Sequence, residues 1–568
     1  TRNNITKMSH NTFDAIVIGA GMSGGWAAKE FCEAGFKTLL IERGKNVEHI
    51  KDYPTANLYP WELQHRNRLG HEEKTANPIA SKCYAFREDT THFFVKDDEH
   101  PYVQQKPYDW IRGYQVGGKS LMWARQTQRW SQYDFDGPAR DQFAVPWPIS
   151  YNDLAPYYAH VEKFVGISGN KDGLDVLPDG EFLPSFDLNC LEDHFRVSIQ
   201  QHYSDRHVIR ARCAHLTQPQ PIHLQQGRGQ CLTRLQCERG CPFGGYFSAN
   251  SSTIPWAQKT GNLTLKSNKV VISIAYDEAQ KKASGVYVID AISGEKEFYQ
   301  AKVIFVNAGT LNTNLILLNS TSNRFHNGLG NDSGTLGKYV AFHNYRARAS
   351  AVFPGFEKMA TEGRKPSGIY MPRFKNVTHA SENFKRGYAI DFYMYRPLIT
   401  DTTPMGDALV RSLLKEKNYG PWMAGAQMMG ETLPKASNFV SLHPQLKDKW
   451  GVPQLNINID YDDNDEAMIQ DFFTEIKSMF IKAGFQNIET SDSHQNPGLD
   501  IHEMGGARMG KDPKTSVTNQ WNQLHDCPNV YVTDGACMTS TSTQNPSLTY
   551  MAITARAAQH AAAVLKEE

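Results

Sequence analysis

The chain has 568 residues and a mass of 64.0 kDa, long enough for two domains or for one elaborated domain with a large core. Its 60 basic and 60 acidic side chains give a formal net charge of zero, and no block of five or six like charges stands out. The sequence therefore lacks the electrostatic signature of a protein that binds nucleic acid or an anionic membrane. We expect the partner to be a small molecule or another protein.

Nine cysteines in a chain of this length argue against a disulfide scaffold, and an odd number leaves at least one thiol free. No run of 18 apolar residues occurs, so no transmembrane helix is predicted. The polar start TRNNITKMSH contains no visible signal peptide. Six scattered cysteines are expected to act as buried small hydrophobic residues: Cys32, Cys83, Cys190, Cys213, Cys527 and Cys537.

The stretch FDAIVIGAGMSGGWAAKEFCEAGFKTLLIERG (13–44) predicts a buried strand, a glycine turn, a helix and a second strand that ends at Glu42. Gly19 permits the tight turn, Gly21 lets a pyrophosphate approach the backbone, and Gly24 allows the helix to pack closely on the strand. The helix N-terminus would bind the phosphates, and Glu42 would accept hydrogen bonds from a ribose diol. The unit predicts a bound dinucleotide, either FAD or NAD.

Three later stretches add glycine turns to this pattern. IRGYQVGGKSLMWARQTQRW (111–130) predicts a glycine loop that ends in aromatic residues, and KVIFVNAGTLNTNLILLNS predicts a strand over 303–306 that turns into a helix. NVYVTDGACMTSTSTQNPSLTYMAITARAAQHAAAVL predicts a strand, a turn, a loop and a final helix that begins at Pro546. The turn residues of these stretches are Gly113, Gly117, Gly118, Gly309, Asp534 and Gly535.

The middle of the chain has a different pattern. Residues 151–211 and 331–494 contain strand-like runs such as GYAIDFYMY and PQLNINIDYD between turn residues, with an amphipathic helix before Gly484. We assign them to a substrate domain. Residues 51–107 are polar and irregular, and we expect a surface loop or a partner-docking segment there. The remaining pieces are predicted to form one discontinuous dinucleotide-binding domain, over 8–50, 108–150, 212–330 and 495–568.

The motifs GAGMSGG, GYQVGGKSLMW, VNAGTLNTNLIL, HEMGGARMG and VTDGACM…NPSLT occur in the order found in glucose-methanol-choline (GMC) oxidoreductases. The chain resembles this family over essentially its whole length. The resemblance implies an α/β (α+β) fold with a Rossmann-like FAD-binding domain and an inserted antiparallel-sheet substrate domain. It implies FAD, bound covalently or not, at Gly19, Gly21, Gly24, Glu42, Gly117, Gly118, Ser120, Met122, Trp123, Val271, Ala308, Gly309, Asp534, Gly535, Asn545 and Pro546.

The stretch CLTRLQCERGCPFGG (231–245) places Cys231, Cys237 and Cys241 within eleven residues. With a proline after the last cysteine, it is similar to the family branch that includes glucose, fructose and gluconate dehydrogenases and glucoside 3-dehydrogenases. That resemblance implies a [3Fe–4S] cluster, and three thiolates on a glycine-rich loop can each bind one iron. The alternatives are zinc with His223 as a fourth ligand, and unliganded thiols.

Two residues match the catalytic positions of the family: His502 in IHEMGGARMG and Asn545 in TQNPSLT. Flavin-dependent alcohol oxidation needs a base for the hydroxyl proton, and histidine can take a proton near neutral pH. An amide can hold the substrate oxygen without competing for that proton. Many family members have a second histidine where this chain has asparagine, which leaves His502 as the base. Gln427 and Glu431 are predicted to bind substrate hydroxyls.

The resemblance implies an FAD-dependent dehydrogenase, rather than an oxidase, that oxidises a secondary sugar hydroxyl. Within the family, the chain most resembles glucoside 3-dehydrogenases, which make 3-keto sugars from glucosides and disaccharides. Electrons would leave through the cluster to an acceptor such as cytochrome c, with a small partner subunit and export to the periplasm rather than a cytoplasmic location. One alternative is a gluconate-type or polyol dehydrogenase, favoured if Arg508 points into the pocket. Another is a redox module without catalytic turnover.

Overall fold

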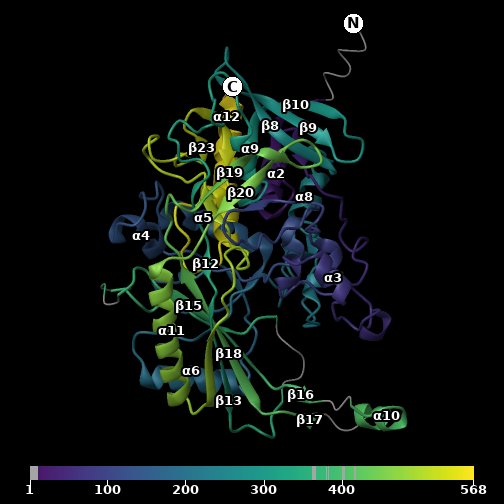
Figure 1. Ribbon diagram of the computed structural model, residues 1–568, viewed down its shortest axis with the longest axis vertical. Helices are drawn as coiled ribbons and strands as arrows, with labels where there is room; N and C mark the ends of the chain where they lie inside the picture. Colours follow the sequence, from purple (N-terminus) through teal and green to yellow (C-terminus); the bar gives the residue numbers. More distant parts are fainter. Residues whose placement is uncertain are drawn as a thin grey trace.

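The computed structural model describes residues 11–360, 366–378, 380, 383–399, 403–414 and 418–567. Figure 1 shows two lobes. The upper lobe contains the strands of a mainly parallel sheet, and the lower lobe contains an antiparallel sheet with helices α6 (Cys190–His202) and α11 (Asp463–Lys482) beside it. This arrangement confirms the predicted fold class.

The sheet of the upper lobe has eight strands, with β1 (Thr12–Ile18) at its centre. β1 pairs in parallel with β10 (Lys296–Val306) and with β2 (Thr38–Ile41), and its apolar residues are almost all buried. Continuous apolar runs of this kind are typical of strands covered on both faces. The other strands are β7 (Leu263–Lys266), β24 (Cys527–Val532), β23 (Gln523–Leu524), and the antiparallel pair β8 (Lys269–Asp277) and β9 (Lys282–Asp290).

Two long-range helix contacts complete this lobe. α2 (Met22–Glu33) follows β1 through the glycine turn, and α12 (Ser547–Glu567) packs against both α2 and α5 (Tyr151–Val165). α9 (Thr310–Leu318) begins directly after Gly309, as predicted. The final helix begins at Ser547, one residue after the predicted start. The predicted strand–turn–helix units at the two ends of the chain are therefore adjacent in the fold.

The lower lobe contains a seven-stranded antiparallel sheet in the order β21–β13–β18–β15–β14–β6, with β12 also paired to β18. Alternate side chains on one face form an apolar core with α6 and α11, whose apolar positions recur at helical spacing. The strands are β6 (Ile209–Arg210), β12 (His343–Asn344), β13 (Ala347–Phe353), β14 (Ile369–Met371), β15 (Tyr388–Tyr395), β18 (Trp422–Glu431) and β21 (Gln486–Asp492).

A five-stranded sheet between these regions was not predicted. It brings together β3 (Val103–Gln104), β11 (Lys338–Ala341), β19 (Phe439–Lys447), β20 (Pro453–Asn458) and β22 (Met504–Gly506). These strands come from three separate pieces of the chain. The pairing of β11 with β22 places the residues just before β22 next to the residues that lead from β11 into β12. The sheet packs against α9 in the upper lobe, and β11 leads directly into β12 of the lower sheet.

The segment 51–107 is irregular, as predicted, but it has its own apolar core. It contains the short helix α3 (His71–Ala76) and single 3-10 turns, and a cluster including Tyr53, Phe86 and Phe93 is buried. Arg234 donates a hydrogen bond of 2.6 Å to the carbonyl of Ala56, so the segment packs on the cysteine-rich loop.

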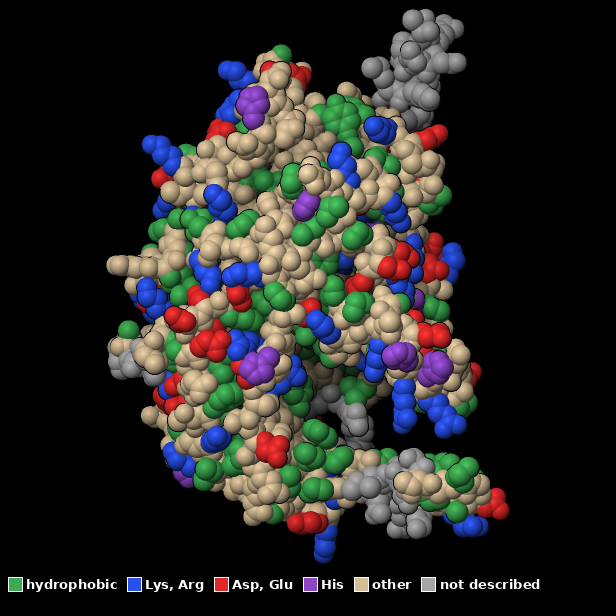
Figure 2. Space-filling view, in the orientation of Figure 1, with side chains coloured by type: hydrophobic (Ala, Val, Ile, Leu, Met, Phe, Trp, Pro, Cys, Tyr) green, Lys and Arg blue, Asp and Glu red, His purple; other side chains and the backbone are tan. Residues whose placement is uncertain are grey.

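The surface agrees with the neutral composition, because basic and acidic side chains are interspersed over the face in Figure 2. Among the helices in the described ranges, none is long and apolar enough to cross a membrane. An arm carrying β16 (Leu398–Ile399), β17 (Asn418–Tyr419) and α10 (Asp407–Leu414) projects from the lower lobe (Figure 1).

Candidate active site

A cavity lies at the point where three helices begin. α2 starts at Met22, α9 at Thr310 and α12 at Ser547, and all three residues line the cavity. Helix N-termini present unpaired N–H groups and favour negative charge. The α2 sequence, which is described completely, has neither an acidic residue in its first turn nor a capping side chain. Its N-terminus is therefore available to an anionic ligand such as a pyrophosphate.

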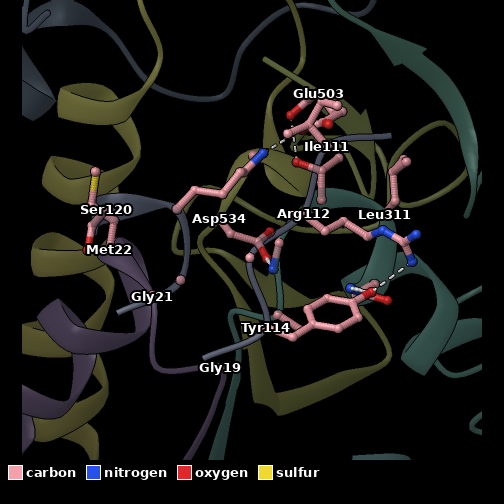
Figure 3. A pocket seen from close by; sticks show the side chains of 18 of the residues that line it. Gly19, Gly21, Met22, Ile111, Arg112, Tyr114, Ser120, Leu311, Glu503 and Asp534 are labelled. Atoms are coloured by element: carbon pink, nitrogen blue, oxygen red, sulfur yellow. Dashed lines mark hydrogen bonds and ion pairs between the residues drawn. The ribbon is translucent and has the colours of Figure 1, made fainter. Parts of the chain in front are cut away.

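Most predicted cofactor residues line this one cavity, although they come from four distant parts of the chain. Figure 3 shows Gly19, Gly21 and Asp534 together, with Glu503 at the far end. The predicted residues in the lining are Gly19, Gly21, Glu42, Gly118, Ser120, Met122, Trp123, Val271, Ala308, Gly309, Asp534, Gly535, Asn545 and Pro546. Gly24 and Gly117 lie outside it and have packing roles.

The glycines of the first turn have different physical roles. Gly19 has a φ of +99°, and a Cβ atom there would lie 2.2 Å from the carbonyl oxygen of Asn307. A Cβ on Gly24 would lie 1.7 Å from the carbonyl oxygen of Gly19, so only glycine lets α2 pack this closely on the turn. A Cβ on Gly21 would meet no described atom within 4 Å. Gly21 thus faces open space of the kind that a closely bound ligand needs.

Two buried carboxylates hold the turns around the cavity. Glu42 accepts hydrogen bonds from the backbone N–H groups of Ala20 (3.0 Å) and Gly44 (2.9 Å), and burial raises its pKa to about 6. Asp534 accepts from the N–H of Gly309 at 3.1 Å, and burial also raises its pKa to about 6. Glu42 directly follows β2, where the sequence pattern places it, and its contact with a ribose stays a prediction.

The structure brings His502 and Asn545 together. The Nδ2 atom of Asn545 lies 3.3 Å from the Nε2 atom of His502, and both residues line the cavity. Burial, with His343 and Lys119 nearby, lowers the pKa of His502 well below its ordinary value. The imidazole is therefore neutral near pH 7 and can accept a proton. A proton acceptor and an amide meet in a cavity suited to a dinucleotide.

A family model with the description GMC oxidoreductase matches residues 13–344, and a second with the same description matches residues 434–554. The chain belongs to the GMC oxidoreductase family. Its cofactor is accordingly FAD, and its reaction class is the oxidation of CH–OH groups. The uncapped α2 N-terminus, the open space at Gly21 and the acceptor Glu42 all fit FAD.

Several known proteins are similar to this GMC oxidoreductase along its length. The 2-methyl-1,2-propanediol dehydrogenase of Mycolicibacterium austroafricanum is 27% identical, with 96% of this chain and 94% of that protein covered. The fructose dehydrogenase large subunit of Gluconobacter japonicus is 24% identical, with coverages of 97% and 98%. A solved structure of formate oxidase from Aspergillus oryzae RIB40 superposes with a TM-score of 0.60 at 14% identity, covering 98% and 99% of the two chains.

Glu431 is committed to a buried ion network rather than to the cavity. Its carboxylate accepts from Arg373 at 2.9 Å and from Arg386 at 3.0 Å, and all three side chains are fully buried. Asp134 pairs with Arg373 at 2.8 Å, and Asp141 pairs with Arg386 at 2.6 Å. Glu431 is not among the cavity-lining residues, so the geometry gives no support to its predicted contact with substrate.

Gln427 does not line the cavity either, so its predicted substrate contact stays a prediction. It lies directly opposite Asp391 in the β15–β18 pair, on the sheet face that points away from α6 and α11. Asp391 is bonded to Gln126, which lines the cavity. Arg508 does not line the cavity. Its guanidinium stacks on Tyr339 at 3.7 Å, so the basic contact that would favour an acidic substrate is not made by this residue.

The three clustered cysteines are free and partly buried. Burial, and then the neighbouring Cys241 thiol, raise the pKa of Cys231. In the part of the chain that the structure describes, no group of three or more His, Cys, Asp or Glu residues is placed to hold a metal ion. His223 is not available as a zinc ligand, because both of its ring nitrogens are in hydrogen bonds. Its Nδ1 accepts from the Gln220 N–H at 3.0 Å, and its Nε2 lies 3.0 Å from the Lys163 carbonyl oxygen.

One buried cation faces the cysteine loop. Arg228 is 1% exposed, and within the described residues its Nη2 atom has no hydrogen-bond partner. Burial lowers the pKa of Arg228 to about 9, and the nearby Cys241 thiol opposes this shift. Cβ atoms at Gly244 and Gly245 would crowd Arg228 and Cys231, so the loop closes tightly around this point. The loop therefore places a buried donor, unpaired in the described part of the chain, near the Cys241 thiol.

Sequence motifs did not identify several residues around the cavity. His343, in β12, contacts His502 but lies outside the family motifs. Asp391 and Gln126 meet across the lobes, and Arg43 stacks on Tyr114 at 4.1 Å at the edge of the cavity. Each of these contacts depends on strand pairing or on contact between the lobes, which local sequence signals do not report.

Proposed function

We propose that this GMC oxidoreductase is an FAD-dependent dehydrogenase that oxidises a secondary hydroxyl of a sugar. The C3 hydroxyl of glucosides and disaccharides is the first candidate. The observation that carries the proposal is the meeting of His502 and Asn545, at 3.3 Å, in the cavity lined by the predicted FAD residues. The similarity to a diol dehydrogenase and to a fructose dehydrogenase subunit supports a polyhydroxylated substrate.

The residues beside the catalytic pair also support this substrate class. Tyr84 and Gln126 line the cavity, and Asp391 bonds to Gln126. The Tyr345 ring lies 5.7 Å from the ring of His502. Aromatic faces and hydrogen-bonding groups suit the C–H faces and hydroxyls of a carbohydrate. A polyol is the second candidate, on the same observations.

The chain's residues then have distinct tasks. The alcohol O–H proton moves to Nε2 of His502, and Asn545 holds the substrate oxygen by its amide. Bound FAD would supply the two-electron acceptor that oxidation of the alcohol to a carbonyl compound requires. Burial lowers the pKa of the His502 imidazole, so the ring is neutral near pH 7 and its lone pair can take the proton.

The test is anaerobic mixing of the FAD-loaded protein with methyl glucoside, lactose, glucose, gluconate and 1,2-propanediol, with flavin bleaching as the readout. We expect bleaching by glycosides and its loss in His502→Gln, with FAD content unchanged. Bleaching by gluconate or the diol alone would move the assignment to the acid or polyol class. Bleaching by no alcohol would refute the proposal and favour the redox module. Turnover with ferricyanide but little with oxygen would distinguish a dehydrogenase from an oxidase.

We further propose that Cys231, Cys237 and Cys241 hold a [3Fe–4S] cluster, with Arg228 as its buried cationic neighbour. Such a cluster accepts electrons one at a time. The cysteine spacing and the unpaired Arg228 donor support this assignment. The similarity to a protein described as a large subunit supports a small partner subunit. A cytochrome c as acceptor and export to the periplasm complete the proposal.

Cys237→Ser tests the cluster separately from FAD. We expect about three irons per chain in the unchanged protein, as the cluster requires, and loss of iron and sulfide with FAD retained in the variant. Cys190→Ser is the matched control, because Cys190 is a partly buried cysteine outside the loop. An unchanged protein without iron, or iron retained in Cys237→Ser, would overturn the assignment.

A further inference from the structure

A second histidine lies directly behind His502. His343 is the first residue of β12, and its side chain is completely buried. The two imidazole rings are perpendicular, with centroids 5.0 Å apart, and their Nδ1 atoms are 2.9 Å apart. His343 does not line the cavity, so any effect that it has on substrate must pass through His502.

The backbone holds both histidines in place. One carboxylate oxygen of Asp500 accepts from the N–H of His343 at 3.0 Å and from the N–H of His502 at 3.2 Å. The other accepts from the N–H of Gly498 at 3.0 Å. Because one buried side chain fixes both backbone segments, the contact between the two rings is part of the fold.

The hydrogen bonds determine which ring nitrogens carry protons. His343 Nε2 lies 2.9 Å from the carbonyl oxygen of Thr541, and a carbonyl can only accept, so Nε2 carries a proton. Burial lowers the pKa of His343 to about 4, so the ring is neutral near pH 7 and its Nδ1 has a lone pair. The contact between the two Nδ1 atoms then requires His502 to donate. His502 consequently has its proton on Nδ1 and its lone pair on Nε2.

The other side of His502 agrees with this arrangement. Its Nε2 lies 3.3 Å from the amide nitrogen of Asn545, a donor that needs a lone pair to bond to. Among the described residues, the Asn545 Oδ1 atom has no partner, so the contact through Nδ2 is the one that joins this amide to His502. If His502 had its proton on Nε2, its contact with Asn545 would join two donors. Its contact with His343 would then join two acceptors.

We propose that His343 is a positioning residue that, through its bond to the Thr541 carbonyl, holds His502 in the tautomer whose Nε2 lone pair takes the substrate proton. The inference rests on the proposed function for the identity of the proton donor, but the tautomer itself is a property of the resting protein. When Nε2 gains the proton, Nδ1–H keeps its acceptor, so the charged ring is stabilised without movement.

The charges around the pair act in opposite directions. Glu431 is directly opposite His343 in the β12–β18 pair and raises its pKa, whereas Arg373 lowers it. Lys119, which pairs with Glu503 at 3.2 Å, lowers the pKa of His502. Burial is the largest cause at both histidines and outweighs Glu431, so both rings are neutral near pH 7, the state in which the tautomer matters.

The test compares two substitutions in the FAD-loaded protein. His343→Gln provides an amide oxygen that can accept from His502 and an amide N–H that can donate to Thr541. His343→Leu fills similar space and provides neither group. Histidine labelled with ¹⁵N reports which ring nitrogens are protonated, and the His502 signals are identified by their loss in His502→Gln.

We expect a protonated Nδ1 and a bare Nε2 at His502 in the unchanged protein and in His343→Gln. We expect the opposite tautomer in His343→Leu, with flavin bleaching slower by about 100-fold, within the range that a general base contributes. FAD content and the unfolding midpoint should match between the two variants. A proton on Nε2 of His502 in the unchanged protein would overturn the inference, as would a His343→Leu variant that keeps both tautomer and rate. If no alcohol bleaches any form, the proposed function fails while the tautomer is still measured.

Discussion

Replacing Glu431 distinguishes a residue that holds the fold from one that binds substrate. The buried network contains three carboxylates, of Asp134, Asp141 and Glu431, and two guanidinium groups, of Arg373 and Arg386. Glu431 is the only one of the three that bonds to both cations, at 2.9 and 3.0 Å. Removing its carboxylate therefore takes a partner from both arginines at once.

The cost follows from the burial of the groups. The side chains of Glu431, Arg373 and Arg386 are each 0% exposed, so water cannot replace the lost contacts. Removing one partner of a buried ion pair costs about 3–5 kcal/mol, and we expect this loss of unfolding free energy in Glu431→Ala. Glu431→Gln keeps an oxygen acceptor but loses the charge, so we expect a smaller loss of about 2 kcal/mol.

The assay is urea unfolding of the FAD-loaded protein, together with the KM for the substrate that bleaches the flavin. Glu466→Gln is the matched control, because Glu466 pairs with Arg346 but is 52% exposed, and an exposed pair contributes only about 0–1 kcal/mol. We expect KM to be unchanged in every variant that folds. A Glu431→Ala variant of normal stability with a raised KM would refute the structural role and restore the predicted substrate contact.

Two further predictions concern the cofactor turn and pH. Gly24→Ala should lower the free energy of unfolding by about 1–3 kcal/mol, because its Cβ would lie 1.7 Å from the Gly19 oxygen. Gly21→Ala should leave unfolding of the FAD-free protein unchanged and weaken FAD binding roughly tenfold in a fluorescence titration. Equal destabilisation by both substitutions would contradict this distinction. Burial raises the pKa of Asp391 and of Asp500 from 3.8 to about 7, so the folded state holds their protons more tightly and unfolding free energy should fall as pH rises through this range. Asp391→Asn should make that fall smaller in urea unfolding at a series of pH values, and an unchanged slope would show that Asp391 titrates normally.

Local sequence signals predicted the elements that have a local cause. Gly19 adopts a positive φ, and Gly24 packs against the carbonyl oxygen of Gly19. These two glycines lie in the same short stretch of sequence, so a local motif reports both features. The strand, turn and helix at Gly309 and the final helix after Pro546 were found for the same reason. The structure brings His502 and Asn545, which the family motifs singled out, into one cavity, although 43 residues separate them.

The parts that were missed depend on pairing between distant segments. His343 meets His502 across 159 residues, and its role depends on β12 pairing with the end of β18. Glu431 looks like any polar residue near a strand end, and only the fold shows that two arginines enclose it. The five-stranded sheet joins strands from three parts of the chain, two of which are too short to produce a periodic pattern.

The buried ion network and the proposed catalytic pair, His502 and Asn545, are parts of one hydrogen-bonded assembly. Asp134, which pairs with Arg373, also accepts from the Ser542 hydroxyl at 2.8 Å and from the Gln544 amide at 3.0 Å. These residues lie between Thr541, whose carbonyl orients His343, and Asn545, which contacts His502. Loss of the network should therefore loosen the segment that fixes the base on both sides. A Glu431→Gln variant that still folds should accordingly reduce its flavin more slowly at unchanged KM, because the substrate contacts remain while the tautomer and the amide are held less firmly.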